Sequence, residues 1–315
     1  MGRYRYGLEN EIMNGKLLLD LAWSKSIEVY HPDVCHILRM SANPVLLASG
    51  LGLADGLLWH KGGYLILSDV LKNEIIKYTK IQGVETILDQ SGLTDSFSSY
   101  HSEQIGSNGI AYDQDGNFVF CQQGNHAIAR LHKDGTVEKL IDSFEGKKLN
   151  SPMDLTVGLD GSIYFTDPPN GLKDKKKQQD VAQPVSGVYR WFEGNLELLS
   201  SEFAYPSGIC FSPDHRFLYV ASNDSEQKEI YRYTLEAGAL IDGKVFIHEQ
   251  AKGIRTDKRG NLFLATDAGV KIFSSEGIKL GLVKTTAIVT SVCIEGNTLY
   301  MATPHKLFKF ALRSK

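Results

Sequence analysis

Short runs of apolar residues, of the length of β-strands, recur along most of the 315-residue chain. Each repeating unit starts with a small or polar residue, continues with three or four mostly apolar residues, passes through a turn, and ends in a β-branched or aromatic run. Six such units follow one another, beginning at Asp55, Asn108, Met153, Ser207, Lys252 and Thr290. Because no strong helical periodicity interrupts them, the pattern predicts β-sheet throughout this region.

The spacing within and between the units predicts how the strands are arranged. In five units the turn lies eight positions after the first residue, at Gly63, Gly116, Gly161, His215 and Gly260, and in the sixth it comes two positions earlier, at Gly296. The starts of successive units are 38 to 54 residues apart, close to the length of a propeller blade. Further strand-like runs at 128–132, 187–192, 230–235, 269–274 and 306–312 supply about four strands per unit. We therefore expect an all-β fold, a six-bladed β-propeller with a short N-terminal extension.

The domain boundary follows from where the repeat begins. Residues 41–315 are expected to form the propeller, and residues 1–40 the extension, in which 8–24 is a candidate short helix. The run 44–49 precedes the first unit, and we expect it to be the outer strand of the last blade. Such pairing closes the ring and removes an exposed sheet edge.

Equivalent positions on the inner strands of a propeller converge on its central channel. The six starting residues should therefore form a ring, and five of them are polar, which favours a ligand site over a dry plug. Filling the channel remains the alternative. Asp55 starts the first unit and Lys252 the fifth, two blades apart in one direction and four in the other, and we expect their side chains to face each other across the channel. Three hypotheses remain open for Lys252: a structural ion pair with Asp55, direct or through water; an anchor for an oxyanion or carboxylate; or a base or Schiff-base nucleophile.

Other polar residues are candidates for the same face. His101 and Glu103 lie in the Ser-rich stretch 90–106, just before the second unit, and a histidine there is a candidate general acid or base. Asp69, Asp167 and Asp267 follow second strands, and we interpret them as caps of turns.

Composition limits the class of partner. The formal charge is −3, from 34 Lys+Arg and 37 Asp+Glu, which gives no reason to expect nucleic acid or an anionic membrane as partner. No apolar stretch approaches the length of a membrane span, and no signal-peptide pattern follows Met1. The four cysteines are scattered singly, as expected for free thiols in the cytoplasm.

Several segments together resemble a known family. Residues 145–172, EGKKLNSPMDLTVGLDGSIYFTDPPNGL, look like the bacterial gluconolactonase signature, and 107–130, 186–190, 206–222 and 260–273 also follow family patterns. From about Val34 onward, the chain resembles the senescence marker protein / gluconolactonase / luciferin-regenerating enzyme family. This resemblance implies a six-bladed propeller with a divalent cation, usually calcium, at one end of the channel. The cation polarises a lactone carbonyl and helps to generate the attacking water.

The resemblance also implies a set of site residues, from which this chain departs. The family's metal ligands are a Glu, an Asn and an Asp on the first, fourth and fifth blades, and these positions hold Asp55, Ser207 and Lys252. The substrate-contacting Asn of the third blade is replaced by Met153. Only Asp55 keeps ligand chemistry, and Lys252 brings a positive charge where a carboxylate belongs. We therefore expect no cofactor; if a metal binds, Asp55 is its ligand.

The leading hypothesis is a divergent lactonase-like enzyme that acts on a small organic substrate at the channel mouth without calcium. The reaction is hydrolysis of a lactone or ester, or an isomerisation, elimination or cyclisation of a specialised metabolite. The candidate catalytic residues are Lys252, Asp55 and His101, and the candidate substrate-binding residues are Asn108, Met153, Ser207, Thr290 and Glu103. The first alternative is a catalytically inactive binding or scaffold propeller. The second is a calcium-dependent lactonase with substituted ligands, such as Asn223 or Asp267.

Overall fold

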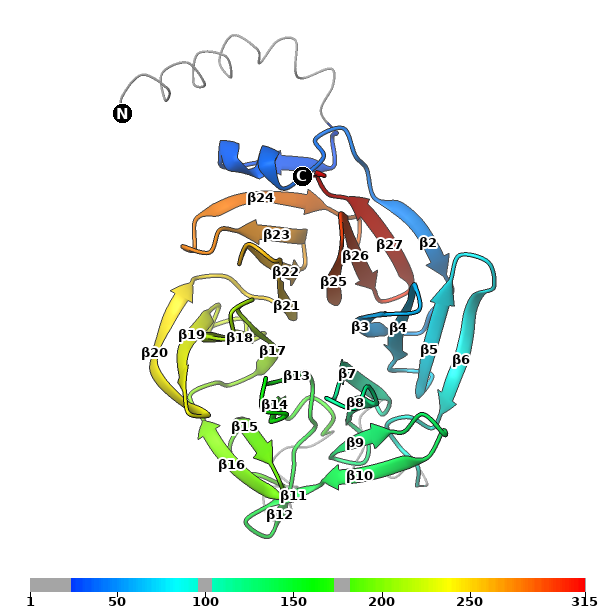
Figure 1. Cartoon of the computed structure of the whole chain (residues 1–315), viewed down its shortest axis with the longest axis vertical. Helices are drawn as coiled ribbons and strands as arrows, with labels where there is room; N and C mark the ends of the chain where they lie inside the picture. The colour runs from blue at the N-terminus through cyan, green and yellow to red at the C-terminus, as the bar shows by residue number, and fades with distance from the viewer. Residues whose placement is uncertain (1–23, 96–103, 173–181, 315) are drawn as a thin grey trace.

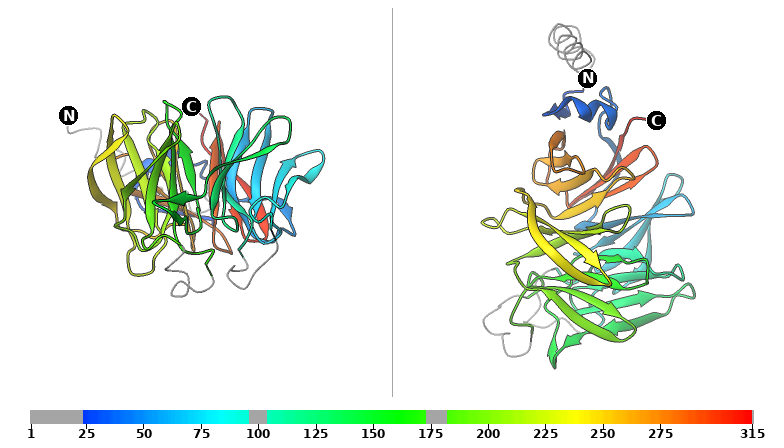
Figure 2. Two further views of the ribbon diagram at one scale, coloured as in Figure 1. Left: turned by 90° about the horizontal axis from the view of Figure 1, so that it is seen from below. Right: turned by 60° about the vertical axis from the view of Figure 1, so that its left-hand side comes forward.

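The computed structural model describes residues 24–95, 104–172 and 182–314. Within these ranges the chain forms a ring of six β-sheets around a central axis (Figure 1). Seen from the side, the sheets stand next to one another as the blades of a short, thick disc (Figure 2). The all-β six-bladed propeller expected from the repeat is confirmed.

Each blade is an antiparallel meander in which every strand pairs with the next. The blades, from the inner strand outward, are: first, β3 (Ala54–His60), β4 (Tyr64–Asp69), β5 (Glu74–Thr79) and β6 (Gly83–Asp89); second, β7 (Ser107–Tyr112), β8 (Phe118–Gln122), β9 (Ala127–Leu131) and β10 (Val137–Ile141); third, β13 (Leu155–Val157), β14 (Ile163–Asp167), β15 (Gly187–Phe192) and β16 (Asn195–Ser200). They continue with: fourth, β17 (Pro206–Phe211), β18 (Phe217–Ser222), β19 (Ile230–Glu236) and β20 (Ala239–Ile247); fifth, β21 (Gly253–Thr256), β22 (Leu262–Thr266), β23 (Gly269–Phe273) and β24 (Lys279–Lys284); sixth, β25 (Ser291–Glu295), β26 (Thr298–Thr303) and β27 (Lys306–Ala311). A small hairpin, β11 (Ser143–Phe144) with β12 (Lys147–Lys148), joins the second blade to the third.

The ring is closed by a strand from the N-terminal part of the chain. Strand β2 (Val45–Ser49) pairs antiparallel with β27, with Leu46 opposite Phe308, so the sixth blade takes its outer strand from before the first. This is the closure that the run 44–49 predicts. It ties the two ends of the repeat together with backbone hydrogen bonds, as a closed sheet architecture requires.

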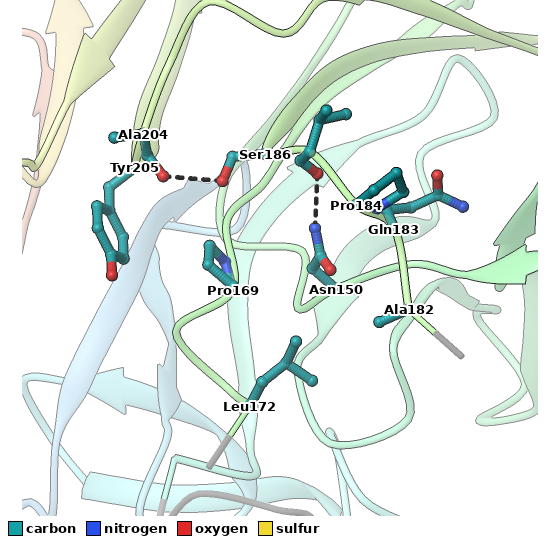
Figure 3. A pocket seen from close by; sticks show the side chains of 10 residues that line it. Asn150, Pro169, Leu172, Ala182, Gln183, Pro184, Ser186, Ala204 and Tyr205 are labelled. Carbon is teal, nitrogen blue, oxygen red and sulfur yellow. Dashed lines mark hydrogen bonds between the residues drawn. The ribbon is translucent and has the colours of Figure 1, made fainter. Parts of the chain in front are cut away.

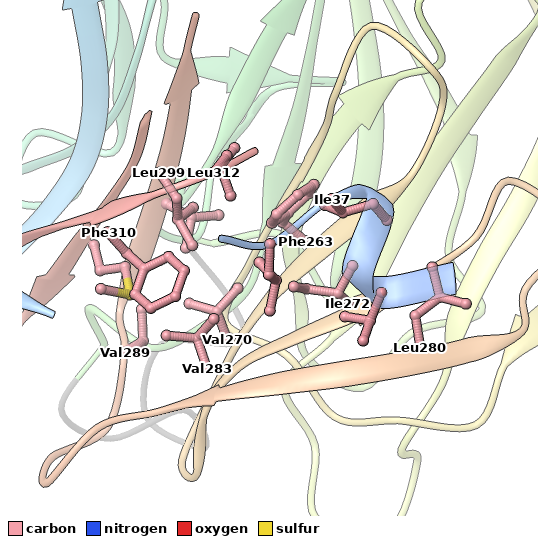
Figure 4. Close-up of a cluster of buried hydrophobic side chains, with 14 of the residues drawn as sticks. Ile37, Phe263, Val270, Ile272, Leu280, Val283, Val289, Leu299, Phe310 and Leu312 are labelled. Carbon is pink, nitrogen blue, oxygen red and sulfur yellow. The ribbon is translucent and has the colours of Figure 1, made fainter. Parts of the chain in front are cut away.

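Part of the N-terminal extension is also integrated into the propeller. Strand β1 (Ile27–Val29) adds a fifth strand to the fifth blade by pairing with β24, and the 3₁₀ helix η1 (Pro32–His36) follows it. Val34, Ile37 and Leu38 join an apolar cluster that includes side chains of the fifth and sixth blades (Figure 4). The candidate helix 8–24 lies almost entirely outside the described residues.

The cores lie between blades, where side chains from facing sheets pack together. The largest fully buried side chains include Tyr164, Tyr189, Phe120, Phe165, Phe263 and Phe310. The four cysteines are free, as expected, and three of them are buried. Burial raises the pKa of Cys210 to about 12 and that of Cys293 to about 11, so both thiols stay protonated near neutral pH. No helix within the described ranges is long and apolar enough to cross a membrane.

Candidate functional site

The six starting residues of the repeat lie at the beginnings of the inner strands. Asp55, Asn108 and Ser207 are within the first two residues of β3, β7 and β17, while Lys252 and Thr290 come directly before β21 and β25. Figure 1 shows these inner strands grouped around the axis. The repeat symmetry therefore places all the equivalent backbone positions at one end of the channel, but the direction of each side chain depends on its neighbours.

Asp55 is a buried acid at the channel end of the first blade. It is 9% exposed, and its Oδ1 accepts a hydrogen bond from the Gly56 N–H at 2.8 Å. Burial raises the pKa of Asp55 to about 7, against the opposing effect of the Lys252 ammonium. A carboxyl group with this pKa exchanges a proton near neutral pH, which suits a general acid or base.

Lys252 acts on Asp55 through space. Its main-chain N–H pairs with Ala265 O at 2.9 Å, and its side chain is half-buried. The ammonium favours the charged form of Asp55, although no ion pair within 4.0 Å joins the two among the described residues. Of the two forms of ion pair considered for Lys252, the direct one is therefore not formed.

Three buried residues without charge, Asn108, Met153 and Gln123, lie on the second and third blades at this end. Asn108 is 4% exposed, and Met153, 6% exposed, accepts a long hydrogen bond at its Sδ from Asn170 Nδ2, at 3.8 Å. Asn170 lies in the loop after β14, outside the repeated sequence pattern, so the pattern did not identify it as a site residue. Gln123, directly after β8, is 1% exposed, and among the residues that the structure describes neither polar atom of its side-chain amide has a hydrogen-bond partner. A buried amide without a partner costs about 1–3 kcal/mol, so Gln123 joins the candidate ligand-binding residues.

The hydroxyl groups of Ser207 and Thr290 are hydrogen-bonded to the main chain. The Ser207 hydroxyl donates to Ala251 O at 2.7 Å and also approaches Ala221 O, and the residue is fully buried. The Thr290 hydroxyl donates to Ala54 O at 2.5 Å. Both hydroxyl groups thus bind main-chain carbonyl groups, each including one at the start of the next blade. Repeat symmetry determines where the backbone of each residue lies. It does not determine to which carbonyl oxygen a hydroxyl group donates its hydrogen bond.

One bidentate ion pair, between Arg255 and Asp154, was not predicted from the sequence. Arg255 binds Asp154 in a bidentate ion pair, with Nη1–Oδ2 at 2.8 Å and Nη2–Oδ1 at 3.1 Å. Asp154 also accepts the main-chain N–H groups of Leu155 and Ile209 at 3.0 and 3.1 Å. The pair therefore connects the third, fourth and fifth blades. Asp154 raises the pKa of Asp55 and Arg255 lowers it, both less than burial and Lys252 do.

The acids that follow second strands have the expected capping role in two cases of three. Asp69 accepts the N–H groups of Gly52 and Leu53 at 2.8 and 3.0 Å. Asp167 accepts those of Asn150 and Ser151 at 2.7 and 2.8 Å, and burial raises its pKa to about 7 despite these hydrogen bonds. Asp267 is exposed instead, and Thr266 makes the local contact by donating to Gly269 O at 2.9 Å.

Two candidate residues cannot be placed. His101 and Glu103 lie outside the described residues. Their catalytic and substrate-binding roles therefore remain predictions from the sequence.

The donors at the family's metal positions do not fit calcium. Calcium takes six to eight oxygen ligands, several of them carboxylates. Here Asp55 is the only carboxylate of the set, the Ser207 hydroxyl is committed to main-chain carbonyls, and Lys252 is cationic. Of the proposed substitute ligands, Asn223 accepts a hydrogen bond from Gln250 at its Oδ1, at 3.4 Å, and Asp267 is exposed. Within the described ranges, no three His, Cys, Asp or Glu residues are grouped to hold a metal ion.

A six-bladed propeller with a polar channel end is the architecture of the lactonase-type propellers. The sequence profile of the SMP-30/gluconolactonase/LRE-like region matches residues 53–305, so the chain belongs to this family. The gluconolactonase of Zymomonas mobilis is 29% identical over 302 residues, covering 90% of this chain and 85% of that protein. The lactonohydrolase oryL of Aspergillus oryzae is 25% identical over 190 residues, covering 51% of this chain and 43% of that protein.

The solved structures agree with the sequence comparison. A gluconolactonase from Xanthomonas campestris superposes with a TM-score of 0.80 at 26% identity, covering 91% of this chain and 95% of that one. The family expected from the sequence is confirmed.

Proposed function

We propose that this protein is a lactonase-type hydrolase that opens a small cyclic ester at the channel end with its own side chains, Lys252 and Asp55. The observation that carries the proposal is the electrostatic effect of the Lys252 ammonium on the buried Asp55 carboxyl group, at the channel end of a lactonase-family propeller. The relatives named as gluconolactonase and lactonohydrolase support a lactone as the substrate class. The poor fit of the metal positions to calcium supports a reaction in which protein side chains do the work.

In the proposed mechanism, a water molecule attacks the carbonyl carbon of the lactone. The Asp55 carboxylate accepts the proton of that water, as its pKa of about 7 allows near neutral pH. The Lys252 ammonium stabilises the negative charge that develops on the carbonyl oxygen. When the tetrahedral intermediate collapses, the carbon–oxygen bond of the ring breaks, and the ring oxygen takes the proton from Asp55. The product is the open-chain hydroxy acid, and Asp55 returns to its starting state.

The proposal is tested by measuring acid release from glucono-δ-lactone and a panel of small lactones, with and without a chelator, above the uncatalysed background. We expect activity that is insensitive to the chelator. Lys252→Ala should lower kcat by about 10²–10³, the usual loss when one group that stabilises an oxyanion is removed. Lys258→Ala is the matched control, because this exposed lysine lies in the β21–β22 turn of the same blade. It should leave kcat unchanged.

Two outcomes would contradict the proposal, and each supports a different alternative. Loss of activity with the chelator and its recovery with Ca²⁺ would favour a calcium-dependent lactonase with other ligands. No turnover of any lactone by the wild-type protein would favour a binding or scaffold propeller.

A further inference from the structure

Two hollows in the surface differ in size and in the state of their polar groups. One lies at the channel end, between loops of the third and fourth blades, and measures about 260 Å³ (Figure 3). Its Asn150 Nδ2 donates to Val185 O and its Ser186 Oγ donates to Ala204 O, both at 2.8 Å, as the dashed lines show. The other, the outer-edge pocket, lies at the outer edge of the sixth blade and measures about 330 Å³. Only the outer-edge pocket reaches the range of about 300–1,000 Å³ that is usual for ligand sites.

The floor of the outer-edge pocket is one face of the sixth sheet. Val45 of β2 lies opposite Lys309 of β27. Thr298 of β26 lies opposite Ala311, two residues further along β27. Because paired residues, and residues two apart on one strand, share a face of the sheet, these four side chains lie on the same side. All four residues line the pocket.

The first blade covers only part of this face. Tyr300, opposite Lys309, stacks on Trp59 of the first blade, with ring centroids 5.3 Å apart. Towards the turn between β25 and β26, Val45 is 51% exposed and Ala311 is half-buried. Apolar surface therefore remains open to solvent at this corner of the sheet.

The wall of the pocket is the segment that leads from η1 to β2 and runs beside β27 (Figure 1). Arg39 N donates to Ala311 O at 3.4 Å, which attaches the segment to the sheet. Ala42 N donates to Arg39 O at 2.8 Å, which closes a turn within the segment. Main-chain hydrogen bonds thus hold the wall in place, and the pocket is preformed.

The polar groups that the wall and floor offer to a ligand are hydrogen-bond donors. Asn43 lines the pocket, and its Oδ1 accepts hydrogen bonds from the hydroxyl groups of Ser24 and Ser26, at 2.5 and 3.0 Å. This leaves the Asn43 Nδ2 group to donate. Arg39 and Lys309 add two positive charges, and neither side chain forms an ion pair or a hydrogen bond with any described residue.

No acidic residue balances these two charges within the described lining. Glu295, opposite Thr298 on the inner strand β25, is exposed and does not line the pocket. A guanidinium group binds a carboxylate through two parallel hydrogen bonds, and an ammonium group adds a point charge. Contact with the apolar floor favours a ligand that also carries a hydrocarbon part.

We propose that the outer-edge pocket binds a small organic carboxylate with an apolar chain, of the size of a medium-chain fatty acid. The carboxylate pairs with Arg39 and Lys309, and the chain covers Val45 and Ala311. This site is separate from the channel end, because β25 leads from Thr290 at the channel end to the turn beside the pocket. The proposal therefore does not depend on the lactonase activity.

Isothermal titration calorimetry of the full-length protein with octanoate, octanol and acetate tests the proposal. Octanoate carries both the charge and the chain, and it should bind with a Kd below about 1 mM. Octanol lacks the charge and acetate lacks the chain, so each should bind at least about tenfold more weakly.

Charge reversal locates the bound octanoate. Lys309→Glu and Arg39→Glu change exposed side chains, and each should weaken octanoate binding at least about tenfold. Lys306→Glu is the matched control, because this exposed lysine lies on the same strand but on the opposite face of the sheet. It should bind octanoate as the wild type does, and so should Lys252→Ala, which alters the channel end.

Three results would overturn the proposal. The first is no binding of octanoate by the wild-type protein, and the second is equal binding of octanoate and octanol. The third is octanoate binding that is unchanged in both Lys309→Glu and Arg39→Glu, which would place octanoate elsewhere. If Lys252→Ala alone lost the binding, octanoate would lie in the channel and not in the outer-edge pocket.

Discussion

At the residue scale, the burial of Asp55 suits its proposed role as a base but lowers the stability of the folded protein near neutral pH. Burial disfavours its ionised form, and the distant Lys252 only partly compensates. The pKa of Asp55 is about 7 in the folded protein but near 3.9 in an unfolded chain. Because the folded state holds the proton more tightly, Asp55 favours folding below about pH 4. This contribution is lost as the pH rises towards and through 7.

The direction of this pH dependence of stability gives a prediction for the Asp55→Asn variant. Asparagine can still accept the Gly56 N–H but never ionises, so the variant should be more stable than wild type at pH 8 and similar to it at pH 4. Three pKa units correspond to at most about 4 kcal/mol in the free energy of unfolding, and partial exposure should reduce this. Urea denaturation at the two pH values measures the difference, and lactone hydrolysis by the same variant should be lost. A variant less stable than wild type at pH 8 would contradict this account of Asp55.

At the element scale, a β-bulge at the start of β3 sets the orientation of the Asp55 side chain. The pairing with β4 shifts register between Asp55 and Leu58, and Gly56 within the bulge has a φ of +60°. A Cβ atom at Gly56 would lie 2.1 Å from Asn108 O, on the neighbouring blade. Gly63, in the turn of the same hairpin, has a φ of +85° but nothing within 4 Å of such an atom.

The two glycines make a matched pair of substitutions. Gly63→Ala should cost about 1 kcal/mol, which is the strain of the left-handed conformation alone. Gly56→Ala should cost several times more, because the backbone of the second blade must also move. It should lower activity too, since the same shift displaces Asp55 and Asn108. Thermal unfolding and lactone hydrolysis of both variants provide the check, and equal destabilisation would show that the first two blades are not in close contact here.

At the scale of the whole molecule, the Asp154–Arg255 pair links three blades within the channel. The side chains of Asp154 and Arg255 are 10% and 22% exposed, and the guanidinium also donates to Ile209 O, at 3.3 Å. Removing one partner of a buried pair leaves the other charge without compensation, whereas replacing both can be nearly neutral. The pair therefore constrains how the third, fourth and fifth blades sit together.

A double-mutant cycle measures that constraint. Arg255→Met should lower the free energy of unfolding by about 3–5 kcal/mol, because it leaves Asp154 without its charge partner in a buried site. The double variant Asp154→Asn with Arg255→Met should recover part of this loss, so the two effects should not add. Additive effects in urea denaturation would indicate that the two side chains do not interact in solution.

The pattern of the chain was sufficient to predict the architecture and part of the channel end. Strand alternation, turn residues and blade-length spacing are local properties, and six copies of them leave a closed ring as the arrangement that buries every apolar face. The same symmetry predicted the positions of Asp55, Asn108 and Lys252 at one end of the axis, and the run before the first unit predicted the closing strand.

Only the tertiary structure decided which polar groups at the channel end are bound by other parts of the chain. Ser207 and Thr290 sit at symmetric positions, yet their hydroxyls meet carbonyls of other strands, and no local pattern specifies those partners. The pairing of Asp154 with Arg255 joins residues 101 positions apart. Local sequence determines the backbone of a repeat, whereas contacts between blades determine the direction of each side chain and hence the chemistry of the site.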